Sequence, residues 1–202
     1  MKNFNEKSRA AYNDKADGYD SSREGQFTRN IHRLLLPGMK WSENQSVLDV
    51  ACGNGSFLAA MNGQKPIRSF GIDISERMVE HAAARNPAMR FFVSGCEVLP
   101  FQDDTMDIIT VCAAYHHFPD TAAFAKEAGR VLRSNGMLYI ADMYLPGFMR
   151  VLLNPFVPLL FKDGDVRFYS PREIINNFRR FGFVEAGVKI SGNIQITSML
   201  KG

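Results

Sequence analysis

A glycine-rich segment after a short apolar run is the first place where residue types and spacing suggest ligand binding. In VLDVACGNGSF, residues 47–57, a β-rich run leads through Gly53 and Gly55 into helix-forming residues. In an open α/β sheet, ligands bind beyond the carboxyl ends of strands, where the strand order reverses. Because glycine has no Cβ atom, the backbone there can approach a ligand closely. A turn that only packs tightly is the alternative, so a second feature is needed.

An acidic residue at the end of the next β-rich run supplies that feature. The run IRSFGID ends at Asp73. A carboxylate at this place accepts charge-assisted hydrogen bonds from both hydroxyls of a ribose. The alternative is a helix cap, in which Asp73 or Ser75 satisfies amides of the helix that starts near Glu76. Ser75 fills the capping role better, so the sequence favours ribose binding by Asp73.

The glycine segment also narrows the choice of nucleoside. The dinucleotide fingerprint GxGxxG uses its third glycine for close helix packing beneath a pyrophosphate. Leu58 occupies that position here. The sequence therefore points away from NAD and toward an adenosine that carries an amino acid.

The elements that must position these residues alternate between strand and helix from residue 46 onward, which predicts parallel βαβ units. The expected strands are SVLDV, IRSFGID, MRFFVS, DIITVCA and GMLYIAD. The expected crossover helices are GSFLAAMN, SERMVEHAAARN with Ser75 as N-cap, and TAAFAKEAGRVLRSNG, which ends in Asn135-Gly136. Residues 1–40 predict two further helical stretches ahead of the sheet.

The C-terminal part of the chain has a different pattern. SPREIINNFRRFG predicts a helix with Ser170 as its cap, Pro171 at the first helical position and an end at Gly182. The β-rich runs FVEAGVKI and NIQITSML follow, separated by Ser191-Gly192, a linker of the hairpin kind. The last strand is therefore expected to be antiparallel to its neighbour.

Composition limits the class of partner. The 202 residues are 46% hydrophobic and 22% charged, with a formal net charge of +3 and no concentrated basic stripe, which favours a small molecule over nucleic acid. Cys52, Cys96 and Cys112 form no CxxC pair, so we expect small buried thiols, no metal site and a reducing cytoplasm. The polar start of the chain does not fit a signal peptide.

An apolar run from Met143 to Phe161 resembles a membrane span only at first sight. Pro146, Pro155 and Pro158 interrupt a helix, and Arg150 would lie near the middle of the bilayer. We expect no membrane span, and interpret the segment as a lid or pocket wall.

Four motifs in order resemble those of class I S-adenosylmethionine-dependent methyltransferases, especially the ubiquinone and menaquinone biosynthesis branch. They are VLDVACGNG, GIDIS, CEVLPFQDDTMDIITVCAAYHHF and RVLRSNGMLYIAD. The resemblance implies a Rossmann-like, doubly wound α/β fold: a seven-stranded, mostly parallel sheet with its last strand antiparallel and helices on both faces. It also implies S-adenosyl-L-methionine as cofactor. The hairpin inferred from the C-terminal runs agrees with this fold.

The same resemblance implies roles for individual residues. Backbone carbonyls of Ala51 and Gly53 would meet the methionine amino group, while Asp49 would brace the turn and Asp73 would hold the ribose. The N-terminal helical segment covers the cofactor in the family, which implies a contact from Tyr19. The full set expected at the cofactor is Tyr19, Asp49, Ala51, Gly53, Gly55, Asp73, Ile74, Met78, Cys96, Glu97 and Ala113.

Within that N-terminal segment, the residues have two interpretations. Tyr12 and Tyr19 would stack or hydrogen-bond at the cofactor, with Arg23 paired to its carboxylate. Alternatively, the two tyrosines form only one apolar helix face.

The adenine side departs from the family pattern. Ile74 and Met78 would flank the ring, but the family has Gly-Asp-Ala where this chain has Ser94-Gly95-Cys96, so the Asp that contacts the adenine amine is missing. Adenine would then rely on the Cys96 backbone and on Glu97. The sequence predicts that Gly95→Asp tightens binding.

The acceptor side is expected after the fourth strand, at residues 113–118. His116 or His117 is a candidate general base for a hydroxyl acceptor, because imidazole titrates near neutral pH. The alternative is that adjacent histidines at a strand end only pack and hydrogen-bond.

Together these features predict one methyltransferase domain over residues 1–202. Its parts are a helical cap (1–40), a cofactor-binding core (46–142), an apolar lid or insert (143–169), and a C-terminal helix and hairpin (170–202). The acceptor would be small and apolar or aromatic. A non-catalytic nucleoside-binding module and an NAD-dependent oxidoreductase are the alternative functions. The sequence leaves the oligomeric state open, with a homodimer as one outcome.

Overall fold

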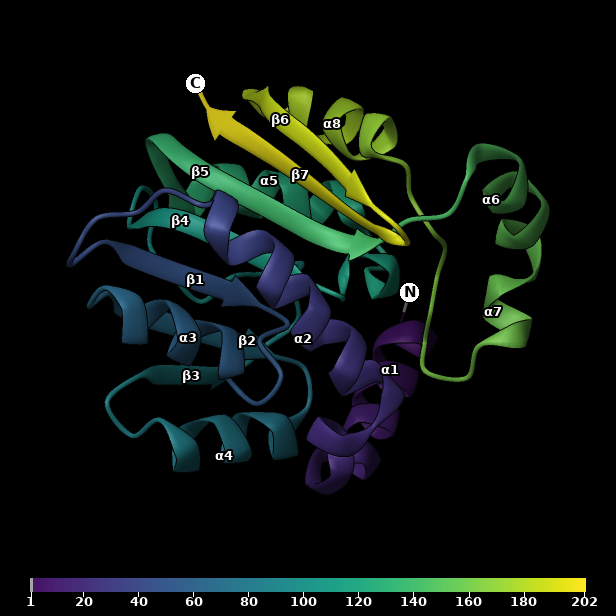
Figure 1. Ribbon diagram of the computed structural model, residues 1–202, viewed down its shortest axis with the longest axis horizontal. Coiled ribbons are helices and arrows are strands. Elements are labelled where there is room, and N and C mark those ends of the chain that lie inside the picture. Colours follow the sequence, from purple (N-terminus) through teal and green to yellow (C-terminus); the bar gives the residue numbers. More distant parts are fainter. Residues whose placement is uncertain (1) are drawn as a thin grey trace.

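A seven-stranded sheet of order β3-β2-β1-β4-β5-β7-β6 lies at the centre of the computed structural model, which describes residues 2–202 (Figure 1). The strands are β1 (Ser46–Val50), β2 (Arg68–Asp73), β3 (Arg90–Val93), β4 (Met106–Cys112), β5 (Leu132–Met143), β6 (Phe183–Ser191) and β7 (Ile194–Lys201). β1 pairs in parallel with β2 and β4, whereas β7 pairs antiparallel with β5 and β6. The predicted doubly wound fold is confirmed, and the strand order reverses beside β1, where a ligand site is expected.

Helices cover both faces of this sheet. They are α1 (Lys2–Lys15), α2 (Arg23–Leu35), α3 (Ser56–Gln64), α4 (Glu76–Arg85), α5 (Thr121–Val131), α6 (Gly147–Leu153), α7 (Val157–Leu160) and α8 (Pro171–Arg179). Neighbouring strand residues point to opposite faces: Val47 and Ile108 pack with α2 and α3, whereas Leu48 and Ile109 join the cluster that contains α5 and α8. Each face therefore has its own apolar core.

Helix α1 and the 3-10 turn η1 (Ala16–Ser21) lie near the carboxyl ends of the central strands (Figure 1). Asn13 Oδ1 accepts a hydrogen bond of 2.6 Å from the Ser75 hydroxyl at the start of α4. Asn54 Nδ2, after β1, donates one of 2.7 Å to Asp20. The N-terminal helical segment is thus tied to the turns that follow β1 and β2.

Two helix starts were predicted correctly from their capping residues. Ser75 accepts from the Met78 amide at 3.1 Å and begins α4. Ser170 forms a capping box with Glu173 at the start of α8, and Pro171 takes the first helical position.

Two predicted boundaries were wrong. The helix expected to end in Asn135-Gly136 ends at Val131, because Leu132 already pairs with Met106 and Asn135 lies within β5 at φ 64°. Asparagine tolerates this left-handed conformation better than most residues, so it marks an irregularity in the strand and not a helix end. The hairpin linker is Gly192-Asn193, since Ser191 still pairs with Ile194.

The apolar segment after β5 forms α6, the 3-10 turn η4 (Asn154–Phe156) and α7, which lie together at one side of the molecule (Figure 1). Val157 is buried, but Phe148 is 78% exposed and Leu159 is 81% exposed. No helix among the described residues is long and apolar enough to cross a membrane.

Candidate functional site

A pocket with about 700 Å³ of empty volume opens at the carboxyl ends of β1, β2 and β4, and we call it the central pocket. Its floor includes Ala51, Asp73 and Ala113, which follow or end these three strands. Tyr12 of α1 and Tyr19 of η1 line it from the other side. The chain therefore forms a site at the position that the glycine turn and the strand-end acid predict.

The turn after β1 is built for close approach by a ligand. Ala51 and Gly53 have φ angles of 59° and 51°, and the Cys52 amide donates to the Ile72 carbonyl at 2.9 Å. A Cβ atom added at Gly53 would meet nothing within 4 Å, so this backbone faces open space in the central pocket. Gly55 differs, because a Cβ there would lie 2.9 Å from the Phe91 ring. Gly55 thus serves helix packing and does not line the central pocket.

Asp73 lies at the end of β2 and connects this turn to α4. Its Oδ2 accepts from the Gly53 amide at 2.8 Å, and its Oδ1 accepts from the Ser75 amide at 2.9 Å. Burial raises the pKa of this carboxyl from 3.8 to about 6, against the opposing effect of the backbone hydrogen bonds. A carboxylate has about four acceptor positions, so Asp73 retains capacity for hydroxyl donors in the pocket.

Asp49 lies within β1 beneath the turn and outside the central pocket. Its Oδ1 accepts from the Thr110 hydroxyl at 2.6 Å, which links β1 to β4. Burial raises the pKa of this carboxyl from 3.8 to about 7, although the Thr110 hydrogen bond acts in the opposite direction. Asp49 also lines a smaller cavity, together with Thr28 and His32 of α2. Its buried carboxyl therefore braces the turn after β1 by joining β1 to β4.

The side expected to hold adenine has an apolar wall. Ile74, Met78 and Cys96 line the central pocket, as does the backbone segment at Ser94 and Gly95. Glu97 does not line it, and its Oε1 accepts from Asn5 Nδ2 at 3.2 Å. Of the two residues suggested in place of the missing Asp, the structure therefore brings only Cys96 to the pocket.

Helix α1 and η1 contribute residues to the central pocket, and only some of them were predicted from the sequence. Tyr19 lines the central pocket, and its hydroxyl lies 2.9 Å from Thr28 Oγ1. Arg23 is exposed and lines no part of the pocket. Asn5 and Ser8 do line it, although their positions on a polar helix gave no signal in the sequence.

The turn η3 (Tyr115–His117) after β4 forms the other end of the central pocket. His117 and Phe118 line it, and His117 Nε2 lies 3.0 Å from the Tyr12 hydroxyl. Burial, reinforced by the neighbouring His116, holds the pKa of His117 well below its usual value. His117 is therefore a neutral imidazole at neutral pH.

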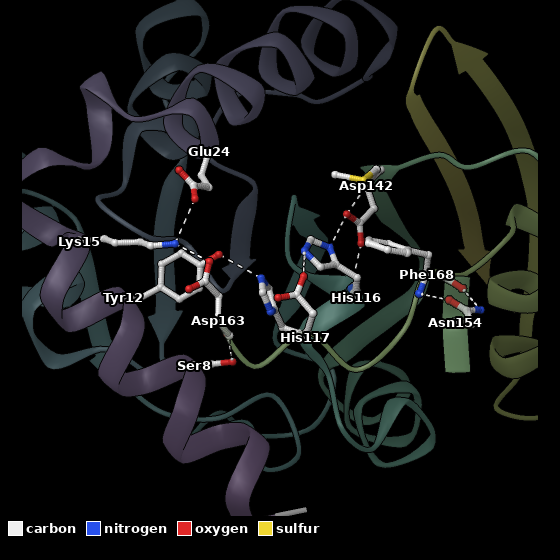
Figure 2. A network of polar contacts seen from close by, with 12 residues as sticks. Ser8, Tyr12, Lys15, Glu24, His116, His117, Asp142, Asn154, Asp163 and Phe168 are labelled. Carbon is white, nitrogen blue, oxygen red and sulfur yellow. Dashed lines mark hydrogen bonds and ion pairs between the residues drawn. The ribbon is translucent and has the colours of Figure 1, made fainter. Parts of the chain in front are cut away.

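His116 lies behind His117 and does not line the pocket. Its amide and its Nδ1 contact Asp142 at 2.9 Å and 2.7 Å, and its Nε2 lies 3.5 Å from Asp165 Oδ1. Burial lowers the pKa of His116, but Asp142, with help from Asp165, raises it further, so the net shift is upward. Figure 2 shows His116 between Asp142 and His117, with Tyr12 beyond His117.

Asp142 and Asp165 are the polar residues of this network that sequence reasoning missed. Asp142 lies near the carboxyl end of β5, so the rule that located Asp73 would also have indicated it. Asp165 lies in a loop far along the chain and had no such signal.

The three cysteines are free and buried, and burial raises the pKa of each thiol. Cys96 and Cys112 line the central pocket as small apolar groups.

This sheet order, with a glycine turn and a strand-end acid at the switch point, defines a nucleoside-binding α/β protein of the doubly wound class. Comparison with known proteins specifies the family. The profile described as "Methyltransferase domain" matches residues 48–140. Residues 48–140 thus form a methyltransferase domain, and the chain is similar to class I S-adenosylmethionine-dependent methyltransferases of the ubiquinone and menaquinone biosynthesis branch.

Two curated relatives illustrate the similarity. The demethylmenaquinone methyltransferase of Thermotoga maritima is 28% identical over 187 residues, which cover 76% of this chain and 81% of that protein. The ubiquinone/menaquinone biosynthesis C-methyltransferase UbiE of Geotalea daltonii is 33% identical over 129 residues. That match covers 60% of this chain and 55% of the relative.

Solved structures share the fold. A chain from the complex of the Haloferax volcanii Trm112 methyltransferase activator with a methyltransferase gives a TM-score of 0.79 at 23% identity, covering 94% of this chain and 97% of that one. The geranyl diphosphate C-methyltransferase of Streptomyces coelicolor, solved with S-adenosyl-L-homocysteine, gives 0.69 at 12% identity, with coverages of 85% and 77%. S-adenosyl-L-methionine is the cofactor of this family, and the open backbone at Gly53 beside Asp73 fits it.

Proposed function

We propose that the chain transfers the methyl group of S-adenosyl-L-methionine to a small apolar or aromatic acceptor that carries a hydroxyl group, in the class of hydroquinones. The observation that carries the proposal is the central pocket itself. It joins a polar end at Gly53 and Asp73 to an end lined by Ala114, His117 and Phe118. One end suits an adenosyl amino acid, and the other suits an acceptor with a ring and one polar group.

The cofactor residues have distinct tasks in this proposal. Asp73 accepts hydrogen bonds from the ribose hydroxyls, and the carbonyls of Ala51 and Gly53 bind the methionine amino group. Ile74 and Met78 enclose the adenine. Support comes from the open backbone at Gly53 and the remaining acceptor capacity of Asp73.

The cofactor supplies an activated methyl group on a positively charged sulfur. Methyl transfer from it is an in-line displacement, so the chain mainly aligns the acceptor atom with the methyl carbon and excludes water. Such alignment contributes about 7 to 11 kcal/mol in favourable cases. The apolar side chains of Ala113, Ala114 and Phe118 suit this positioning role.

The names of relatives support the hydroquinone class. One is a demethylmenaquinone methyltransferase and another is the 2-methyl-6-phytyl-1,4-hydroquinone methyltransferase of Synechocystis. A ring carbon beside a phenolic hydroxyl becomes a nucleophile when the hydroxyl loses its proton. We place that hydroxyl against His117, the pocket-lining member of the histidine pair.

A transfer assay tests the proposal. Purified protein receives S-adenosylmethionine with a labelled methyl group and a panel of hydroquinones, phenols and amines. We expect label in an extracted hydroquinone product, with loss of turnover and retained cofactor binding in His117→Ala. Label in no hydroquinone, or full turnover by His117→Ala, would contradict the proposed acceptor or the proposed role of His117, respectively.

A thermal-shift panel separates the alternative functions. Stabilisation by S-adenosylmethionine and S-adenosylhomocysteine, with none by NAD, agrees with the proposal. Binding of the cofactor without transfer to any acceptor would instead indicate a non-catalytic nucleoside-binding module. The three free, buried cysteines suit a reducing compartment, and we propose the cytoplasm as the place of the reaction.

A further inference from the structure

We propose that His116, His117 and Asp165 bind a divalent transition-metal ion at the acceptor end of the central pocket. Each of the three side chains offers a ligand atom, and these atoms lie within 4.8 Å of one another. His116 and Asp165 are buried, at 8% and 7% exposure. The spacing of these residues along the chain gives no indication of such a site, because Asp165 comes from the loop between α7 and α8.

The hydrogen bonds of His116 leave one ring nitrogen for an ion. Its Nδ1 lies 2.7 Å from Asp142 Oδ1, so this nitrogen carries the proton and donates a hydrogen bond to the carboxylate. The Nε2 lone pair then points toward Asp165. A metal-binding histidine is typically held in this way, with its second nitrogen donating to a carboxylate that fixes the ring.

His117 has the same arrangement with the nitrogens exchanged. Its Nε2 lies 3.0 Å from the Tyr12 hydroxyl, which can either accept or donate a hydrogen bond. Its Nδ1 is buried and meets no partner at good hydrogen-bonding geometry in the described part of the chain, although the nearby backbone of Gly164 partly offsets the lowering of the His117 pKa. With the proton on Nε2, the unpaired Nδ1 becomes the second imidazole ligand, and Tyr12 orients its ring.

The distance between His116 and Asp165 favours an ion over a shared proton. His116 Nε2 and Asp165 Oδ1 are 3.5 Å apart. A charge-assisted N–H···O bond would shorten this to about 2.7–2.9 Å. Two ligand atoms that each lie roughly 2.0–2.2 Å from one tetrahedral ion are about 3.4 Å apart. The observed separation therefore matches two ligands of a common ion.

The two buried carboxylates around His116 also favour binding of a cation. Asp142 and Asp165 approach the same imidazole from its two sides and are both buried. Lys15 is the nearby cation of α1, but its ammonium is bound to Asp163 and Glu24. A divalent ion at the three ligands would replace the His116 proton as the counter-charge to the two carboxylates.

The donor set defines the class of ion. Two imidazole nitrogens and one carboxylate oxygen suit zinc, cobalt, iron(II) or manganese better than calcium or magnesium, which prefer oxygen alone. Of the three ligands only His117 lines the central pocket, so an ion would lie beside the acceptor end of that pocket. With an ion present, the acceptor hydroxyl would bind the ion, and His117 would act as a ligand of that ion and not as the direct partner of the hydroxyl; this last step rests on the proposed function, whereas metal binding itself does not.

Cobalt(II) titration of chelator-treated protein tests the site without any methyl acceptor. We expect one equivalent to bind with visible d–d absorption, and zinc to displace it. His116→Gln should lose the spectrum, while the matched His81→Gln, which alters a partly buried histidine on α4 outside the cluster, should keep it. Asp165→Asn should lose it and Asp103→Asn should not, because Asp103 is an exposed partner of Arg130. Asp142→Asn, which removes only the orienting carboxylate, should weaken binding roughly 10- to 100-fold.

S-adenosylhomocysteine binding and thermal melting of each variant provide the control for folding. The proposal is overturned if wild-type protein that binds the nucleoside takes up no stoichiometric cobalt or zinc. It is equally overturned if folded His116→Gln and Asp165→Asn bind cobalt as tightly as His81→Gln. A metal site without methyl transfer would leave the inference intact and contradict only the function proposed above.

Discussion

The Gly53 amide donates a 2.8 Å hydrogen bond to Asp73 Oδ2, so the turn after β1 and the end of β2 are held together by a single carboxylate. The second oxygen of this carboxylate accepts from Ser75 at the start of α4. Asp73 thus fixes the shape of the turn after β1 and also presents its charge to the central pocket. Any change at this side chain affects both tasks.

Asp73→Asn should weaken S-adenosylmethionine binding about 10- to 100-fold, the usual effect of losing one or two hydrogen bonds to a charged group. An amide also has only one acceptor oxygen, so it cannot satisfy Gly53, Ser75 and the ribose together. Isothermal titration calorimetry measures the change, with Asp103→Asn as the exposed control. Equal Kd values for the two variants would argue against a ribose contact.

Asp49 should make stability depend on pH. Burial raises its pKa from 3.8 to about 7 in the folded state, so the unfolded chain releases this proton first as the pH rises. The contribution is therefore favourable at low pH, falls between about pH 4 and pH 7, and is constant above that range. Asp49→Asn removes this dependence and keeps an acceptor for the Thr110 hydroxyl.

Urea unfolding of both proteins at pH 5 and pH 8 measures the effect. The stability difference between Asp49→Asn and wild type should move in favour of the variant by roughly 2 to 3 kcal/mol between these pH values, at 1.36 kcal/mol per pKa unit. Using the difference cancels the opposite trend from carboxylates such as Glu127, whose pKa is lowered mainly by its hydrogen bond to Arg130. A difference independent of pH would show that Asp49 is ionised in the folded protein.

Much of this arrangement follows from local sequence. Alternating strand and helix runs predicted the sheet, and Ser75 and Ser170 marked helix starts because their side chains bond nearby amides. The Gly53 turn and Asp73 were predictable because the carboxyl ends of parallel strands meet at one edge.

Long-range contacts were not predictable in the same way. His116 meets Asp142 and Asp165 only through the tertiary fold, and no periodicity encodes those distances. The end of α5 at Val131 depends on Leu132 pairing with β4, which outweighs the turn preference of Asn135-Gly136.

The structure shows which group a side chain at position 95 would meet, and this gives the Gly95→Asp experiment a second background for comparison. A Cβ atom at Gly95 would lie 2.8 Å from Glu97 Oε2, so the new carboxylate would meet an existing one. In the Glu97→Ala background, Gly95→Asp should tighten S-adenosylmethionine binding about 5- to 10-fold, the value of one hydrogen bond. In the native background the gain should be smaller. Equal effects in both backgrounds, measured by calorimetry, would show that Glu97 does not oppose the new group.

The exposed side chains of α6 and α7 should contribute little to stability or to cofactor binding. Phe148 and Leu152 are 78% and 68% exposed, and neither lines the central pocket. The double replacement of Phe148 and Leu152 by Ser should change the unfolding free energy by no more than about 0.5 kcal/mol per site, as expected away from packed features. The Kd for S-adenosylmethionine should stay the same.

Phe178→Ala provides the contrast for this experiment. Phe178 is fully buried between Phe124 and Phe183, so its truncation should cost about 3 to 5 kcal/mol. Chemical denaturation and calorimetry on the two variants measure stability and binding separately. If the α6 double variant loses cofactor affinity while it remains folded, the segment must close over the central pocket in solution, as the prediction of a lid requires. If affinity is retained, these two side chains are not needed to hold the cofactor.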